Sequence, residues 1–190
     1  MLPKDFETQL EAVYQKYGLV TPHDFWIVER DDAIAACEAI AAHPELIHYE
    51  VLRPLAIGGG GITLVVSNKQ LQGRLAVLKL PRPVRDAFEK MNQILLGEAT
   101  KLIELNHERV IRIYESGTAR DSSERPIPYY IMEFLEGSMN ALDFVHNNPN
   151  EDTVISVLSS VAEGLDYLHN VAKLVHTDIK PDNIFCDIGG

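Results

Sequence analysis

The chain has 190 residues, of which 46% are apolar and 24% charged, a composition typical of a globular protein and unlike a disordered or collagen-like one. The formal net charge is -11 and the pI is near 5.0, which disfavours nucleic acid and anionic membranes as partners because phosphate binding requires a basic surface. We find no signal peptide and no membrane-spanning stretch. The two cysteines, Cys37 and Cys186, lack metal-ligand spacing and indicate reduced thiols, so we expect a cytoplasmic protein.

The first 47 residues predict short helices. Four apolar residues recur at helical spacing near the N-terminus: Phe6, Leu10, Val13 and Tyr17. Asp31 is placed to cap a second helix over residues 31–43, and the segment 25–29 before it can be either helical or extended. We therefore predict a helical N-terminal extension over residues 1–47.

From His48 onward the sequence becomes rich in β-branched and aliphatic residues, with glycines and polar residues between the apolar runs. This pattern predicts three antiparallel strands, over residues 49–57, 62–67 and 74–80. A long amphipathic helix is predicted next, over about 84–106, with one apolar face: Ile94, Leu95, Ala99, Leu102 and Leu105.

The remaining sequence predicts two more strands and a final helix. The strands cover residues 110–117 and 127–137, with a polar, proline-containing loop between them. The helix covers about 152–170 and carries an apolar stripe: Val154, Val157, Leu158, Val161, Leu165 and Leu168. The predicted class is α+β, with five antiparallel strands and one long helix followed by a helical part.

Two features of the strand region suggest chemistry. The four glycines Gly58–Gly61 can form a hairpin that lies over phosphates, although glycine-rich hairpins are commonly only turns. Lys79 lies inside an apolar strand, where a charge requires a partner, and Glu98 on the following helix is the candidate. The alternative is a lysine at a sheet edge that reaches solvent, with a solvated glutamate.

The segment KLVHTDIKPDNIF, residues 173–185, gathers several polar side chains: His176, Asp178, Lys180, Asp182 and Asn183. The Asp178 carboxylate can accept a hydroxyl proton, Lys180 can neutralise a phosphoryl group in transfer, and Asn183 can bind a hard cation such as Mg²⁺. By composition alone, the segment is more consistent with a polar surface loop that turns at Pro-Asp-Asn, residues 181–183.

The sequence resembles the eukaryotic-type protein kinase family. The resemblance rests on four motifs in the family's order: the glycine segment, the strand A-V-L-K, the helical glutamate and H-T-D-I-K-P-D-N. The resemblance implies a small lobe over residues 48–135 and the start of a large lobe over 136–190, with ATP between them and Mg²⁺ as the metal. Met132 corresponds to the position at the back of the adenine pocket. The ATP-binding residues implied are Gly58, Gly59, Gly60, Gly61, Val65, Ala76, Lys79, Glu98, Met132, Glu133 and Leu135.

The resemblance also assigns roles in the polar segment. Asp178 is implied as the base towards the acceptor hydroxyl, Lys180 as the contact to the γ-phosphate and Asn183 as the metal ligand. A lysine at position 180 is similar to the Ser/Thr branch of the family and disfavours a small-molecule kinase, so transfer to protein Ser/Thr hydroxyls is the predicted reaction. Two positions depart from the family pattern: Thr63 stands at its third glycine, and Thr177 replaces the arginine that would pair with a phosphorylated activation loop.

The resemblance places the family's Asp-Phe-Gly, the source of the principal metal ligand, after Gly190. We therefore expect these 190 residues to be the N-terminal part of a kinase that alone transfers phosphate weakly or not at all. The alternative is an inactive nucleotide-binding or interaction module, similar to a pseudokinase. Apolar residues on the 152–170 helix predict a surface that a partner or second copy covers. The extension can cap the small lobe, brace its helix or dock a partner, and simple stabilisation is the expectation.

Overall fold

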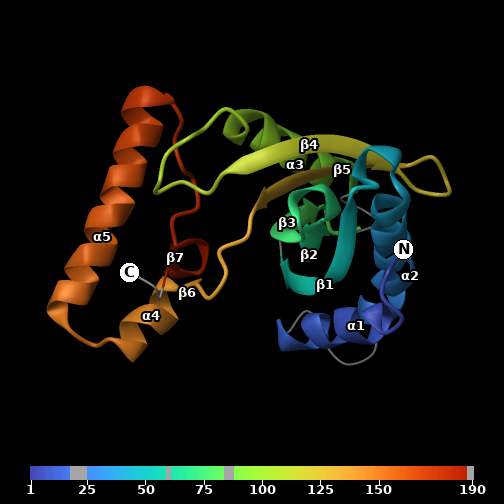
Figure 1. Cartoon of the computed structure of the whole chain (residues 1–190), viewed down its shortest axis with the longest axis horizontal. Helices are drawn as coiled ribbons and strands as arrows, with labels where there is room; N and C mark the ends of the chain where they lie inside the picture. Colours follow the sequence, from blue (N-terminus) through green and yellow to red (C-terminus); the bar gives the residue numbers. More distant parts are fainter. Residues whose placement is uncertain (18–24, 59–60, 84–87, 188–190) are drawn as a thin grey trace. The chain divides into compact units, whose positions relative to one another are not determined.

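The computed structural model describes residues 1–17, 25–58, 61–83 and 88–187, and several side chains of the second and third helices lie outside this description. The chain divides into two compact units (Figure 1). The first comprises Met1–Glu104 and Ile113–Phe134, and the second comprises Leu105–Arg112 and Leu135–Gly190. Within the described ranges, no helix is both long and apolar enough to cross a lipid bilayer.

A five-stranded antiparallel sheet forms the centre of the first unit, in the spatial order β1, β2, β3, β5, β4 (Figure 1). The strands are β1 Tyr49–Gly58, β2 Gly61–Asn68, β3 Arg74–Leu80, β4 Ile113–Arg120 and β5 Pro126–Glu133. The predicted α+β class with five antiparallel strands is confirmed. The fourth strand begins later than predicted, and the fifth ends before residues 134–137.

Two N-terminal helices belong to the same unit as the sheet. They are α1, Phe6–Lys16, which packs on β1, and α2, Phe25–Ala42, which packs on β1, β4 and β5. The predicted apolar face of α1 is partly wrong, because Tyr14 is fully buried whereas Tyr17 is 46% exposed. The buried residues thus follow an i, i+4, i+8 row. The predicted cap at Asp31 is also wrong, since the helix begins at Phe25 and Asp31 lies inside it.

The sheet buries both faces, and different helices cover them. Alternate strand residues point to opposite sides, so Leu64, Leu78 and Ile131 pack with α1 and α2 in one large cluster. Tyr130 and Met132, the neighbours of Ile131 along β5, pack instead with a second cluster that includes a residue of α3, Phe88–Leu102. The N-terminal helices therefore cover one face of the sheet and α3 lies against the other.

The second unit is mainly helical. It contains α4, Ala141–Asn147, α5, Glu151–Asp166, a π-helical turn over Tyr167–Val171, and the short paired strands β6, Met139–Asn140, and β7, Phe185–Cys186. The predicted helix over 152–170 is confirmed, whereas α4 and the two short strands were not predicted. On α5, Ile155 and Leu158 are 52% and 61% exposed, as expected for an uncovered apolar face.

The segment Leu105–Arg112, which the sequence suggested as part of the small lobe, packs within the second unit. The backbone N–H of Asn106 donates to the Tyr167 hydroxyl at 3.2 Å, and the His107 ring stacks on the Tyr167 ring with centroids 4.6 Å apart. Arg109 adds an ion pair to Glu163 at 3.3 Å. These contacts explain why the predicted helix ends at Leu102 and does not continue to residue 106.

The burial of α1 makes a stability prediction. Leu10 has no exposed surface, so Leu10→Ala should lower the free energy of unfolding by about 2–5 kcal/mol, the usual loss for a buried leucine. Thr8→Ala, at an exposed position of the same helix, should change it by less than about 0.5 kcal/mol. Urea unfolding followed by circular dichroism measures both. Equal effects of the two substitutions would show that α1 is not part of the core of the first unit.

Candidate functional site

Lys79 lies half-buried in the middle of the sheet. Its strand neighbours are Thr63 on β2 and Tyr130 on β5, and the three residues are direct cross-strand partners. Its Nζ is 5.4 Å from the centroid of the Tyr130 ring, which is within cation–π range. This contact offsets part of the cost of placing an ammonium among apolar residues. Sequence reasoning missed Tyr130, because the contact depends on β5 pairing with β3.

A row of apolar side chains lies beside Lys79 on the same face of the sheet. Val65 pairs with Val77, and Val77 pairs with Met132. Val65 and Val77 are 2% and 4% exposed, and Met132 packs against the cluster next to α3. The row thus places buried apolar side chains on the same face of the sheet as an ammonium group.

Ala76 does not join this row. It packs in the large cluster with α1 and α2, on the face of the sheet opposite to Lys79. The side chains of a strand alternate with a period of two, so the residue that shares the face of Lys79 is Val77. The expectation for Ala76 is thus corrected to Val77, and the alternation rule could have identified this residue from the sequence.

The glycine segment joins β1 to β2 by a tight hairpin in which Gly58 pairs with Gly61, while Gly59 and Gly60 lie outside the described residues. Gly61 has φ +125, and a Cβ atom at this position would clash with the Leu80 carbonyl oxygen. The backbone conformation and the lack of space therefore both require glycine at position 61. A Cβ atom on Gly58 would meet open space. The hydroxyl of Thr63 donates to the Ala56 carbonyl at 3.1 Å and ties β2 to β1.

The other positions expected to bind nucleotide lie on α3, at the end of β5 and just after it. Glu98 is in α3, but its side chain lies outside the description. Glu133 ends β5, and Leu135 belongs to the second unit, where its carbonyl accepts hydrogen bonds from the N–H and hydroxyl of Ser138. The carbonyl of Leu135 is therefore already engaged within its own turn.

The polar segment of the second unit brings three of its predicted residues together. Lys180 Nζ lies 2.8 Å from Asp178 Oδ2. The Asn183 amide Nδ2 donates to Asp178 Oδ2 at 2.9 Å and to the Asp178 carbonyl at 2.8 Å. The Asp178 and Lys180 side chains are 64% and 47% exposed, so the group faces solvent and not a core. A carboxylate, an ammonium and an amide thus meet around one oxygen atom.

Backbone hydrogen bonds hold this loop at both ends. The N–H of Leu174 donates to the Leu168 carbonyl at 2.8 Å, and the N–H of Ala141 donates to the Ile184 carbonyl at 2.9 Å. Within the loop, His176 Nδ1 accepts the N–H of Asp178 at 3.3 Å. His176 was part of the predicted polar cluster without a role, and the structure gives it a local one in shaping the backbone before Asp178.

Comparison with protein families matches residues 49–190 to the protein kinase domain. The chain belongs to the protein kinase family. The family expected from the glycine segment, Lys79 and the polar loop is thereby confirmed, and the five-stranded sheet with a helical second unit is the corresponding kinase fold.

Individual kinases show the same relation. The chain is 31% identical over 152 residues to the serine/threonine-protein kinase ppk18 of Schizosaccharomyces pombe. The matched region covers 77% of the chain and 11% of ppk18. The chain is 31% identical over 137 residues to Pkn1 of Myxococcus xanthus, covering 72% and 19%. It is 29% identical over 133 residues to the serine/threonine-protein kinase PAK 5 of Rattus norvegicus, and the matched region covers 70% of the chain and 17% of that kinase. The chain thus spans between a tenth and a fifth of the length of these relatives.

In the polar segment, residues 173–185, the hydrogen bonds between side chains favour the charged forms of Asp178 and Lys180. The hydrogen bond from Lys180, followed by that from Asn183, lowers the pKa of Asp178 below its ordinary value. In turn, Asp178 raises the pKa of Lys180. At neutral pH the loop therefore presents a carboxylate, which can accept a hydrogen bond from a hydroxyl group, beside an ammonium group, which can approach an anion.

This ion pair can be tested by titration. Lys180→Met should raise the pKa of Asp178 towards its ordinary value of 3.8, because the hydrogen bond that favours the carboxylate is lost. Lys173→Met removes an exposed lysine from the start of the same segment and should leave that pKa unchanged. Carbon-13 NMR of the carboxyl groups measures both. If Asp178 titrated identically in the two variants, the contact seen here would not determine its pKa.

Proposed function

We propose that the chain supplies ATP-binding and catalytic residues of a kinase that transfers the γ-phosphoryl group of ATP to Ser or Thr hydroxyls of a protein. The observation that carries this proposal is that Lys180 Nζ and Asn183 Nδ2 both lie within 2.9 Å of Asp178 Oδ2. Lys180 in the sequence D-I-K-P-D-N and the names of the serine/threonine-protein kinases above support the choice of acceptor.

The first unit supplies the nucleotide-binding surface. The apolar row of Val65, Val77 and Met132 suits an adenine ring, and the backbone of Glu133, at the end of β5, can offer it hydrogen bonds. The Lys79 ammonium suits the α- and β-phosphates, with Glu98 of α3 as its partner. The glycine segment Gly58–Gly61 suits a backbone that approaches phosphates without side chains in the way.

The loop of the second unit supplies the chemistry. Asp178 Oδ2 accepts the proton of the acceptor hydroxyl while the oxygen of that hydroxyl forms a bond to the γ-phosphorus. At the same time, the bond from the γ-phosphorus to the bridging oxygen of ADP breaks. Lys180 neutralises negative charge on the phosphoryl group as it moves. The lowered pKa of Asp178 keeps the acceptor of the proton ionised at neutral pH.

The residues present fit a magnesium ion, which such a kinase requires with ATP. Both hydrogen bonds of the Asn183 side chain use Nδ2, so its Oδ1 remains as a hard oxygen ligand. Across the described part of the chain there is no group of three or more His, Cys, Asp or Glu side chains that could hold a metal alone. Asn183 would therefore share the ion with phosphate oxygens and water, and the bound ion would neutralise phosphate charge.

We assign the chain's regions as follows: residues 1–47 as an N-terminal extension, 48–135 as the small lobe apart from Leu105–Arg112, which packs within the second unit, and 136–190 as the beginning of the large lobe. We also propose a reducing, cytoplasmic location. Cys37 and Cys186 are both free thiols, and burial raises the pKa of Cys37 to about 12, which keeps it protonated and unreactive.

The proposal predicts that binding and transfer can be separated. Asp178→Asn should reduce transfer from ATP to a protein acceptor by a factor of about 100 or more, while the affinity for Mg²⁺ and ATP changes by less than about threefold. Lys79→Met should weaken both. Lys69→Met, at an exposed position in the turn after β2, is the matched control and should alter neither.

Calorimetry measures nucleotide binding to a polypeptide that contains these residues. The amount of labelled phosphate that the same polypeptide transfers from ATP to the protein acceptor measures phosphoryl transfer. ATP binding without transfer, even with the wild-type residues, would favour the inactive nucleotide-binding module. The absence of ATP binding would exclude both functions.

A further inference from the structure

Two carboxylates on one face of α2, Glu29 and Asp32, contact two arginines: Arg82, which precedes α3 in the sequence, and Arg125, in the turn between β4 and β5. Glu29 is 2% exposed and accepts hydrogen bonds from Arg82 Nε at 2.7 Å and from Arg82 Nη2 at 3.2 Å. The Tyr14 hydroxyl adds a third at 3.4 Å. Arg82 is 8% exposed and lies between the end of β3, which carries Lys79, and the start of α3. This buried pair is well satisfied, so losing either partner would leave a costly unpaired charge.

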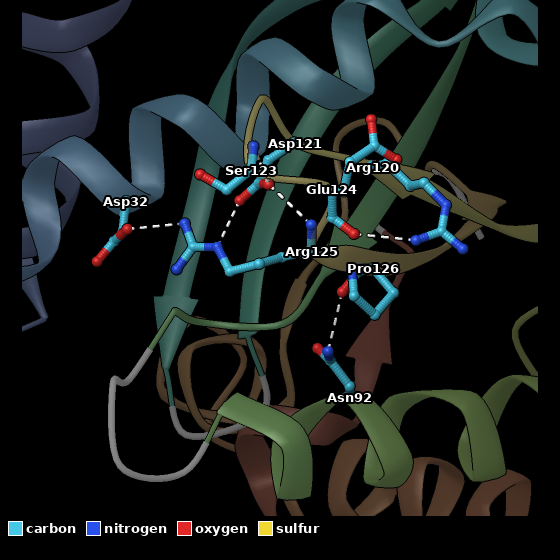
Figure 2. Close-up of polar contacts among 8 residues, drawn as sticks. All are labelled: Asp32, Asn92, Arg120, Asp121, Ser123, Glu124, Arg125 and Pro126. Atoms are coloured by element: carbon cyan, nitrogen blue, oxygen red, sulfur yellow. Dashed lines mark hydrogen bonds and ion pairs between the residues drawn. The ribbon is translucent and has the colours of Figure 1, made fainter.

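Asp32 makes the second contact through the turn between β4 and β5 (Figure 2). Arg125 Nη2 lies 2.8 Å from Asp32 Oδ1, and Arg125 Nε lies 2.6 Å from Asp121 Oδ2. The other oxygen of Asp121 accepts the N–H groups of Ser123 and Arg125 at 2.8 and 3.0 Å. Burial alone would raise the pKa of Asp121, but these hydrogen bonds lower it. The turn is thus closed by its own residues and tied to α2 by Arg125.

The same turn also contacts α3. Asn92, a residue of α3 with 3% of its surface exposed, donates from Nδ2 to the carbonyl of Pro126 at 2.9 Å, and Pro126 directly follows Arg125 (Figure 2). A continuous series of contacts therefore runs from Asp32 on α2, through Arg125 and Pro126, to Asn92 on α3. Among the described side chains, the cluster beside α3 has Leu95, Ile113 and Tyr130 as buried members, with Leu102 and Met132 packed against it.

We infer that α2 braces α3, with Glu29 and Asp32 as positioning residues for the nucleotide-binding groups. Glu29 fixes Arg82, just after the strand of Lys79, and Asp32 fixes the turn that holds the helix of Glu98. The inference rests on the proposed function, because the position of α3 matters for catalysis only if Lys79 and Glu98 act on ATP. A third pair of α2, Arg30 with Glu7, joins α2 to α1 and has no place in the brace.

Hydrogen exchange tests the brace without requiring activity. Asp32→Asn should speed amide exchange in α3, residues 88–102, by about threefold or more, because a partly exposed ion pair supports a factor of that order. It should also weaken the binding of a non-hydrolysable ATP analogue by about two- to fivefold. Glu7→Gln, which breaks the ion pair of Glu7 with Arg30 of α2, should change neither the amide exchange of α3 nor the binding of the analogue. Asp32→Glu, which keeps a carboxylate at this position, should leave both close to the wild type.

The outcomes separate the inference from the proposed function. Unchanged exchange in α3 for Asp32→Asn, or an equal rise for Glu7→Gln, would overturn the brace. Faster α3 exchange only in Asp32→Asn, in a protein that binds no ATP analogue in any form, would support the brace and contradict the proposed function. If Asp32→Asn does not fold, Asn92→Ala decides, because it removes the tie to Pro126 and leaves the ion pairs intact: faster exchange in α3 supports the brace, and unchanged exchange overturns it.

Discussion

The sheet of the first unit must bury two apolar faces, and the way it does so determines where chemistry can occur. Side chains alternate along each strand, so one set, including Leu64 and Leu78, packs beneath α1 and α2. The other set includes Val77 and Lys79. Because the N-terminal helices supply the large core, the second face does not have to provide most of the stability and can carry a charge and a ligand surface. The N-terminal extension is therefore part of the architecture on which the face that carries Lys79 depends.

Apolar packing alone does not determine how α2 is rotated and translated on the sheet, because hydrophobic burial is non-directional. The charged pairs add contacts that do depend on direction. The bidentate contact of Glu29 with Arg82 has a narrow geometry, and Arg125 places its guanidinium between Asp32 and Asp121. Burying such groups contributes little net stability, so their main effect is to select one arrangement of helix and sheet. This selection extends to α3 through the turn of Arg125, because the next residue, Pro126, accepts a hydrogen bond from Asn92 of α3.

Local patterns predicted what is encoded locally. The strands followed from runs of β-branched residues, and the grouping of Asp178, Lys180 and Asn183 followed from their closeness in the chain. The partners of α2 could not be predicted in that way: Glu29 and Arg82 are 53 residues apart, and Asp32 and Arg125 are 93 apart. The sequence predicted only a helix cap at Asp31, next to Asp32, because aspartate is favoured at that position.

The contact between Asp178 and Lys180 also bears on catalysis under the proposed function. While Lys180 donates to Asp178, it lowers the pKa of the carboxyl group and makes it a weaker base. A phosphoryl group that draws the ammonium towards itself removes that hydrogen bond, so the pKa of Asp178 rises towards its ordinary value and its affinity for a proton increases. The base is then strongest when the phosphoryl group is in place, and an exposed ion pair that adds little to stability links phosphate binding to proton acceptance.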